Sequence, residues 1–240
     1  FGWFANPIFT KEGDYPHLMK ANIEYASKQE GLLKSRLPEF APEEIELIKG
    51  SADFLGVNHY TTFYCTSTED QDIEATLLYI PDMEVNCAPN ATADGSTSFW
   101  LKAVPSEFRK SLKWISDQYD NPEMIITENG ISDSGYILND CIRVNYYNSY
   151  LTEMLKAIYE DGCNVTGFTA WSFLDNFEWR SGYTEKFGLY SVDFDDPERS
   201  RTPKMSAYVY KKIIEERTID WEYTPEGFTK CEILHSRDEL

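Results

Sequence analysis

The chain has 240 residues, of which 42% are hydrophobic, so it is long enough to bury the core of one large domain or two smaller ones. Its 41 acidic residues outnumber its 22 basic residues, and the formal charge of −19 repels nucleic acids and anionic membrane surfaces, so we expect neither as a partner. The sequence has no run of about 18 apolar residues, which argues against a membrane-spanning helix. We therefore expect a globular protein.

Short apolar segments alternate with helical ones along the chain, which indicates an α/β architecture with parallel strands. The first predicted helix has Pro42 in its first turn, and a strand is predicted over residues 53–60 (DFLGVNHY). Residues 65–98 are rich in Pro, Asn, Asp, Ser and Thr and predict a long loop. A helix is predicted next, over residues 106–119.

The second half of the chain continues the same alternation. A strand over residues 123–128 (EMIITE) ends at the turn signal Asn129-Gly130, and a helix follows over residues 140–160. A third strand over residues 165–172 (VTGFTAWS) precedes a final helix over residues 203–216. Such a series is typical of part of a (β/α)8 barrel, in which active-site residues lie at the C-terminal ends of the strands.

Three polar or aromatic side chains lie at or next to the ends of the predicted strands: Tyr60, Glu128 and Trp171. A single carboxylate at a strand end is also explained as a structural cap or a metal ligand, so position alone gives Glu128 no role. Residues 169–190 interleave aromatic rings with carboxylates and amides. This mixture suits a sugar, which presents an apolar C–H face and a rim of hydroxyl groups. Phe173 and Tyr190 are equally well explained as core residues.

The five cysteines include no Cys-x-x-Cys pair and no nearby pair of histidines, so neither a metal site nor another cofactor is predicted. In an oxidising compartment a disulfide such as Cys65–Cys87 could form, but spacing does not determine the pairing. An odd number leaves at least one thiol unpaired within the chain. Of the two glycosylation sequons, which begin at Asn90 and Asn164, we expect only Asn90 to be accessible to a glycan.

The two ends of the chain carry sequence signals of their own. The first residues, Phe1-Gly2-Trp3-Phe4, have no initiator Met and no leader pattern, so we expect this end to be internal to a longer precursor. Residues 237–240 (RDEL) are a variant of the tetrapeptide that a receptor uses to retrieve proteins to the endoplasmic reticulum. We therefore expect residence in the endoplasmic reticulum lumen or the secretory pathway.

The sequence resembles glycoside hydrolase family 1, the β-glucosidase family, over essentially its whole length. Six segments carry this resemblance in the family's order: GWFANPIF (2–9), GDYP (13–16), VNHYTT (57–62), ITENG (126–130), AWSFLDNFEW (170–179) and FGLYSVDF (187–194). The resemblance implies that residues 1–240 are the C-terminal part of a single (β/α)8 (TIM) barrel domain, with about strands 6–8 and their helices. The N-terminal half of the barrel would then lie outside this chain.

The resemblance also implies a retaining mechanism, with Glu128 as the nucleophile and Tyr60 as the residue that orients it. The substrate-binding residues that it implies are Asn58 near the 2-hydroxyl, Trp100 against the leaving group, Trp171 as a stacking platform, Glu178 as acceptor for the 4- and 6-hydroxyls, Trp179 as donor to the 3-hydroxyl and Phe187 near C6. Two alternatives stay open, a buried strand-end ring for Tyr60 and a core position for Trp100. Family members that bind phosphorylated sugars lack the carboxylate at the position of Glu178, so a neutral sugar is expected.

A retaining mechanism requires a second carboxylate about 5 Å from the nucleophile, which acts as acid and then as base. The family carries it in an Asn-Glu-Pro tripeptide that this sequence lacks. We therefore expect a partner, the N-terminal half of the same barrel, as a separate chain or as part of a cleaved precursor. The expected activity is hydrolysis of a small β-glycoside, and the expected enzyme is a β-glucosidase. The alternative is a catalytically silent family 1 barrel that binds, stores or carries a ligand.

Overall fold

The structure of the chain is a computed structural model that describes residues 1–67, 85–89, 96–135 and 137–232. The chain forms two compact units. One comprises Phe1–Leu55, Phe63–Ala88 and Ile115–Glu123, and the other comprises Gly56–Thr62, Pro89–Trp114 and Met124–Leu240. The predicted glycan acceptor Asn90 and the predicted retrieval tail at 237–240 lie outside the described residues.

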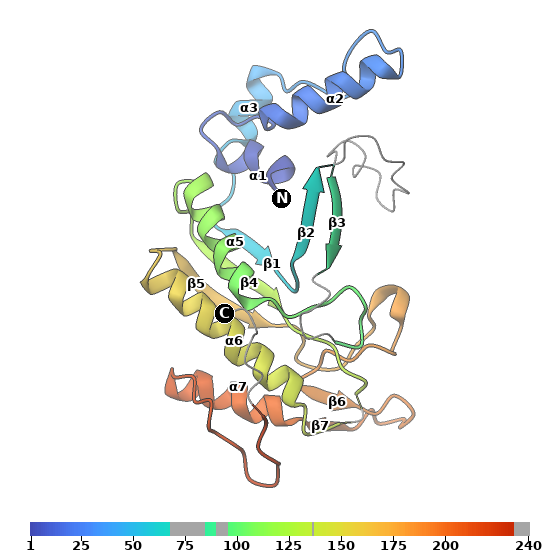
Figure 1. Cartoon of the computed structure of the whole chain (residues 1–240), viewed down its shortest axis with the longest axis vertical. Helices are drawn as coiled ribbons and strands as arrows, with labels where there is room; N and C mark the ends of the chain where they lie inside the picture. The colour runs from blue at the N-terminus through green and yellow to red at the C-terminus, as the bar shows by residue number, and fades with distance from the viewer. Residues whose placement is uncertain (68–84, 90–95, 136, 233–240) are drawn as a thin grey trace. The chain divides into compact units, whose positions relative to one another are not determined.

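The first unit contains α1 (Gly2–Phe9), α2 (His17–Gln29), α3 (Pro42–Ile48), β2 (Phe63–Ser67) and β3 (Val85–Pro89) (Figure 1). The helix predicted at Pro42 is α3, and the Glu44 carboxylate accepts a hydrogen bond of 2.8 Å from the Ala41 amide just before it. Around α1, the Tyr119 ring lies 6.0 Å from the Phe9 ring and its hydroxyl donates to Asn6. These aromatic and polar contacts hold α1 within the unit.

The loop predicted over residues 65–98 is wrong at its start, because residues 65–67 belong to strand β2. Strands β2 and β3 pair in a two-stranded sheet and run in opposite directions in Figure 1. Three of the residues that open β2, Phe63, Tyr64 and Thr66, are aromatic or β-branched types that favour strands, but the residues that follow are polar and predicted a loop. A disulfide joins Cys65 of β2 to Cys87 of β3, as the sequence allowed.

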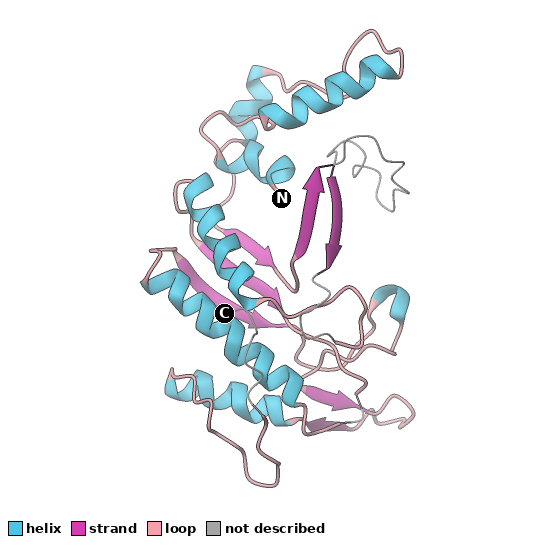
Figure 2. Cartoon of the chain, in the orientation of Figure 1, coloured by secondary structure: helices cyan, strands magenta, loops and turns pink. Residues whose placement is uncertain are grey.

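The remaining elements lie wholly or mostly in the second unit (Figures 1 and 2). They are β1 (Leu55–Asn58), α5 (Pro105–Gln118), β4 (Met124–Asn129), α6 (Cys141–Tyr159), β5 (Val165–Ala170), a 3-10 turn η1 (Trp179–Ser181), β6 (Tyr190–Val192), β7 (Arg201–Pro203) and α7 (Met205–Glu216). The three strands predicted at residues 53–60, 123–128 and 165–172 are confirmed as β1, β4 and β5, with ends displaced by one or two residues.

Strands β1, β4 and β5 form one sheet in the order β1-β4-β5, and β4 and β5 are parallel. The described residues provide no further strand to either edge of this sheet, so it is an open piece of a barrel and not a closed one. Met124 and Ile126 of β4 are fully buried. On the side of α6, the Tyr147 ring contacts Phe168 of β5 at 6.4 Å, and the Tyr150 ring contacts Phe108 of α5 at 5.4 Å. Helix α6 therefore supplies much of the core beneath the sheet.

The start of the final helix differs from the prediction. Pro203 was expected to begin the helix, because proline is common in the first helical turn. It instead ends β7, which pairs antiparallel with β6 through Tyr190 and Pro203. Lys204 has extended backbone angles, and α7 begins at Met205. Proline suits both a first helical turn and the end of an edge strand, so the sequence alone did not separate the two.

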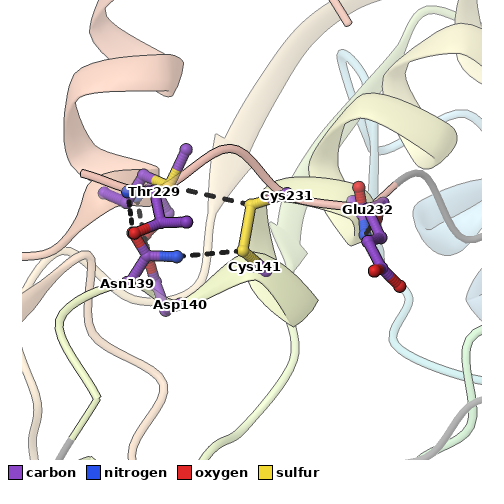
Figure 3. Close-up of a disulfide and its surroundings, with 9 residues drawn as sticks. Asn139, Asp140, Cys141, Thr229, Cys231 and Glu232 are labelled. Atoms are coloured by element: carbon purple, nitrogen blue, oxygen red, sulfur yellow. Dashed lines mark hydrogen bonds between the residues drawn. A yellow bond between two sulfur atoms is a disulfide. The ribbon is translucent and has the colours of Figure 1, made fainter. Parts of the chain in front are cut away.

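A second disulfide, which the sequence did not indicate, joins Cys141 at the start of α6 to Cys231 near the C-terminal end of the described chain (Figure 3). Beside it the Thr229 amide donates to the Asn139 side chain at 2.7 Å. The fifth cysteine, Cys163, is buried and belongs to neither disulfide, in line with the expectation from an odd number of cysteines. The disulfide attaches the last described segment to the beginning of α6.

The expectation that only Asn90 is accessible to a glycan is wrong. Asn164 is exposed just before β5, and Thr166 of the same sequon is exposed as well. The sequon was read as part of an apolar run, but it lies at the start of the strand, where side chains still face solvent. Asn164 is therefore also accessible as an acceptor for a glycan.

Every helix in the described ranges is too short or too polar to cross a bilayer. The same ranges bring together no group of three or more His, Cys, Asp or Glu side chains in a position to hold a metal ion.

Candidate active site

Glu128 is placed by an irregularity near the end of β4. Ile126 pairs with Phe168 and Asn129 with Ala170, so β4 has one more residue than β5 between the two pairs. In a regular strand every second residue lies on the same face, so Glu128 would share the fully buried face of Met124 and Ile126. A bulge of this kind re-aims the side chains that follow it. Glu128 is accordingly only partly buried.

The Glu128 carboxylate is held by a tyrosine from the neighbouring strand end. The Tyr60 hydroxyl, two residues beyond β1, donates a hydrogen bond of 2.6 Å to Glu128 Oε2. Burial raises the pKa of Tyr60, and the hydrogen bond to Glu128 and the negative charges of Glu128 and Glu178 raise it further. Tyr60 therefore stays protonated and acts as a donor at any physiological pH.

The backbone beside Tyr60 is fixed by residues that sequence reasoning did not select. The Tyr146 hydroxyl of α6 donates to the Tyr60 carbonyl at 2.8 Å. The Asn129 side chain donates to the His59 carbonyl at 2.7 Å, and the His59 amide donates to the Glu128 carbonyl at 2.9 Å. Asn129 had been interpreted only as a turn residue. Its place directly after Glu128 was the available signal, because a side chain there can reach the neighbouring strand end.

Glu178 is a second carboxylate at this site. Its Oε1 accepts a hydrogen bond of 3.1 Å from the Trp171 indole. Burial raises the pKa of Glu178, hydrogen bonds from Trp171 and Asn176 lower it, and the charges of Glu128 and Glu185 raise it, with a net upward shift. Mutual repulsion of this kind requires that Glu128 and Glu178 lie close enough to influence each other.

Gly130 has a steric reason for its place in the ITENG segment. A Cβ atom at this position would lie 1.9 Å from the Trp171 carbonyl oxygen, where no side chain can fit. The Trp171 amide also donates to the Asn129 carbonyl at 2.8 Å, and the Trp171–Ser172 peptide bond is cis. The glycine therefore allows the backbone at Trp171 to pack directly against the end of β4.

Three further predicted residues lie around Tyr60 and Glu128. The Phe187 ring is buried and lies 6.0 Å from the Tyr60 ring, and the half-buried Trp100 ring approaches Tyr60 edge-on at 6.2 Å. Asn58 accepts a hydrogen bond of 2.6 Å from the Thr127 hydroxyl of β4. The structure thus brings Asn58, Trp100 and Phe187 to the same strand ends as Glu128.

The segment between β5 and β6 exposes several aromatic rings. Trp179, a predicted substrate-binding residue, is 83% exposed, and Phe173 is 65% exposed. The core alternative for Phe173 is therefore excluded in the described chain, whereas Tyr190, whose ring lies 5.2 Å from Phe173, is partly buried. Exposed rings beside a carboxylate offer an apolar surface to the C–H face of a sugar.

Comparison with known proteins agrees with this arrangement. The model of glycosyl hydrolase family 1 matches residues 1–219. Myrosinase 1 of Brevicoryne brassicae is 42% identical over 216 residues, which are 89% of this chain and 45% of that protein. Cytosolic beta-glucosidase of Cavia porcellus is 40% identical over 221 residues, which are 92% of this chain and 46% of that protein. The chain belongs to glycosyl hydrolase family 1.

A solved structure extends the comparison to the fold. A family 1 beta-glucosidase from the fungus Humicola insolens, in complex with glucose, is 38% identical with a TM-score of 0.75. The match covers 90% of this chain and 44% of that one. The chain therefore spans less than half the length of these relatives, and the predicted fold, a C-terminal portion of a (β/α)8 barrel, is confirmed.

Proposed function

We propose that the chain supplies the nucleophile half of the active site of a retaining β-glycosidase, specifically a β-glucosidase. The observation that carries this proposal is the 2.6 Å hydrogen bond from Tyr60 to Glu128, made at the ends of two strands of a family 1 chain. Among the relatives, the guinea-pig and fungal proteins bear the name beta-glucosidase, and the fungal one was solved with glucose. These names support a glucoside as substrate.

In the proposed mechanism Glu128 attacks the anomeric carbon of the sugar, and the bond from that carbon to the leaving oxygen breaks. The leaving oxygen takes a proton from the acid/base carboxyl group, and a covalent glycosyl-enzyme forms through Glu128. Water, deprotonated by the same carboxylate, then attacks the anomeric carbon and releases Glu128. The Tyr60 hydroxyl keeps the Glu128 carboxylate oriented for the first step, because the donor and acceptor are already in contact.

The terminal sugar is proposed to be neutral and to bind at Glu178. The free acceptor capacity of that carboxylate suits the 4- and 6-hydroxyls, while Trp171 serves as the platform and donates to Glu178. Trp179 would donate to the 3-hydroxyl, and Asn58, Phe187 and Trp100 would line the remaining sides. A phosphate at C6 would meet the negative charge of Glu178 and be repelled.

The acid/base carboxylate is proposed to come from the N-terminal half of the barrel. The open edges of the β1-β4-β5 sheet and the coverage of only 44–46% of the relatives' chains support a missing half. An open sheet leaves unpaired backbone groups at its edges, and a closed barrel removes them. We infer that the active protein contains both halves.

The proposed location is the lumen of the endoplasmic reticulum or the secretory pathway. The two disulfides, Cys65–Cys87 and Cys141–Cys231, support an oxidising compartment. The tail at residues 237–240 supports retrieval to the endoplasmic reticulum. A glycan on Asn90 or Asn164 would fit the same compartment, and peptide mapping after glycosidase treatment tests both acceptors.

The function is tested with the complete barrel, in which this chain is combined with the N-terminal half. A 2-deoxy-2-fluoro-β-glucoside with a good leaving group forms a glycosyl-enzyme that is hydrolysed slowly, and mass spectrometry of the peptides then locates the attached sugar. We expect the sugar on Glu128 and turnover of a chromogenic β-glucoside by the unlabelled protein.

The Asp133→Asn variant is not a suitable control because Asp133 is an ion-paired buried residue. Glu185→Gln is better matched, since it alters a nearby partly buried carboxylate that lies outside the proposed covalent step. Labelling on a residue other than Glu128 would refute the assignment. A complete barrel that binds glucosides but neither hydrolyses them nor becomes labelled would favour the silent binding protein.

A further inference from the structure

Three segments of the second unit carry the proposed active-site residues. We name them the nucleophile segment (residues 128–133), the glycone segment (171–178) and the wall segment (186–189). Their positions are fixed by five buried charged side chains: Asp133, Asp140, Arg143, Asp175 and Lys204. Burying a charge is costly unless it is paired and hydrogen-bonded, so the connections within this ion cluster define its role.

Arg143 of α6 connects the nucleophile segment to the wall segment. Its guanidinium group, fully buried, pairs with the Asp133 carboxylate at 2.6 Å and donates to the Ile131 carbonyl at 3.2 Å. The same nitrogen donates to the Lys186 carbonyl at 2.8 Å. The planar donor set of one arginine thus spans two segments of the proposed site.

Lys204 connects the nucleophile segment to the glycone segment. Its ammonium group, also fully buried, lies 3.2 Å from Asp175 Oδ1 and 3.5 Å from Asp133 Oδ1. Asp175 in turn accepts a hydrogen bond of 2.8 Å from the Gly188 amide of the wall segment. A Cβ atom on Gly188 would lie 2.2 Å from the Asp175 amide nitrogen, so the two segments meet without room for a side chain.

Asp140 attaches this cluster to the helices behind it. Its carboxylate pairs with Arg143 and accepts two hydrogen bonds from Ser206 at the start of α7, from the amide at 2.9 Å and the hydroxyl at 2.6 Å. Asp140 directly precedes Cys141, whose disulfide to Cys231 is shown in Figure 3. The starts of α6 and α7 therefore hold the ion cluster in place, and the cluster contacts the three segments.

We propose that Lys204 and Arg143 are positioning residues that set the placement of Glu128 relative to Glu178. This inference rests on the proposed function, in which Glu128 attacks the sugar that Glu178 holds. Glu128 and Glu178 lie on different segments, and the described cations that bridge these segments belong to the ion cluster. Reacting groups must be held within about 0.5 Å of the productive geometry, and a displacement of about 1 Å can cost about 100-fold in rate.

The test measures kcat and KM of the complete barrel carrying Lys204→Met, which keeps much of the side-chain length and removes the ammonium group. We expect kcat/KM on a chromogenic β-glucoside to fall about 100-fold. The matched control is Lys212→Met on the same helix, because the Lys212 ammonium pairs at 3.1 Å with the exposed Glu216 on the outer surface. We expect Lys212→Met to retain the wild-type kcat/KM.

A double-mutant cycle with Glu178→Gln separates positioning from a general loss of structure. If Lys204 acts through the glycone segment, Lys204→Met should cost less than about 5-fold once Glu178 has already lost its charge, because the two changes then affect one interaction. An equal loss in both backgrounds would show independent structural damage and overturn the proposal. Active-site titration with the slow fluoroglucoside corrects each rate for the fraction of folded protein.

Asp175→Asn provides a second route if Lys204→Met does not fold. It keeps an acceptor for the Gly188 amide but removes the charge that faces Lys204, so we expect a fall of about 10-fold that again shrinks in the Glu178→Gln background. If the unaltered barrel shows no glycosidase activity, the proposed function fails. If the unaltered barrel is active and the variants Lys204→Met and Asp175→Asn have the same kcat/KM, only the positioning inference fails.

Discussion

The carboxylates of the second unit occur in two contrasting environments. Asp133, Asp140 and Asp175 are buried and paired with Arg143 or Lys204. At the proposed active site, Glu128 and Glu178 form no salt bridge with any described residue, and their hydrogen bonds come from the neutral donors Tyr60, Trp171 and Asn176. The paired carboxylates are balanced by buried cations, whereas Glu128 and Glu178 have no cationic partner among the described residues and retain part of their hydrogen-bonding capacity.

This contrast shows how one residue type serves two purposes within a few residues of sequence. A paired, buried carboxylate makes structure rigid, and breaking the pair leaves an isolated charge. Burial raises the pKa of the unpaired Glu178 carboxylate and the charge of Glu128 adds to this, and such shifts are common at functional sites. The distinction predicts that changes in the paired environment lower stability, whereas changes at Glu128 do not.

The sharpest test of the contrast is Glu128→Gln in the complete barrel. We expect kcat/KM to fall by roughly 10⁵-fold or more, because the nucleophile is lost. The free energy of unfolding should stay close to that of the wild type, since Glu128 has no cationic partner among the described residues and its repulsion with Glu178 disappears. Steady-state kinetics and denaturant unfolding measure the two quantities. A large loss of stability with modest loss of rate would reverse the roles assigned to the two environments.

Unlike Glu128→Gln, Arg143→Met should lower stability, in addition to the loss of kcat/KM that its proposed positioning role implies. Removal of this cation leaves Asp133 and Asp140 buried without one of their partners, which we expect to lower the free energy of unfolding by about 3–5 kcal/mol. Denaturant unfolding of the complete barrel measures the change. Lys211→Met is the control, because its exposed pair with Glu215 contributes no more than about 0.5 kcal/mol. Equal stability of the two variants would show that leaving Asp133 and Asp140 buried without Arg143 does not cost the expected free energy of unfolding.

Tyr60→Phe tests the neutral donor at the active site. It removes the hydroxyl that donates to Glu128 and keeps the ring that contacts Trp100 and Phe187. A hydrogen bond to a charged group is worth about 1.5–3 kcal/mol, so we expect kcat/KM to fall about 10- to 100-fold. The expected loss lies mainly in kcat, since the hydroxyl orients the nucleophile and not the sugar. Wild-type kcat would contradict the orienting role.

The smallest expected effect is a dependence of stability on pH through Glu178. Its folded-state pKa is raised by burial, so between the unfolded and folded pKa values the folded state binds more protons than the unfolded state. Stability contributed by Glu178 is therefore greatest at low pH and is lost as pH rises through this window, which begins near the ordinary glutamate pKa of about 4.3. The thermal midpoint of the wild type minus that of Glu178→Gln should fall as pH rises. A rising difference would contradict the direction of the shift.

Several features were predictable because they depend on neighbouring residues. Strands β4 and β5 follow from their apolar, β-branched runs, and the helix over α6 follows from its apolar stripe. The positions of Tyr60, Glu128 and Trp171 at strand ends follow from the same patterns, and the family motifs suggested their roles. The bulge in β4 was not predictable, because an extra residue is defined only by comparison with the pairing partner in β5.

Other features depended on contacts between distant parts of the chain. The second disulfide links residues 90 positions apart, and five cysteines allow many pairings. The steric need for Gly130 arises from the Trp171 carbonyl, which local sequence does not reveal. Nothing in the neighbouring sequence distinguishes Lys204 from the other lysines, yet its ammonium group is fully buried between Asp133 and Asp175.

The sequence by itself determined the class of fold, the strand ends and the family, because periodicity and motifs are properties of consecutive residues. It also identified Glu128 and Glu178 as carboxylates of interest. Only the tertiary structure distinguished them from Asp133 and Asp175, because pairing and burial are set by residues that meet after folding. The physical reason is that a carboxylate's role depends on the charges and donors that surround it, and these come from other strands and helices.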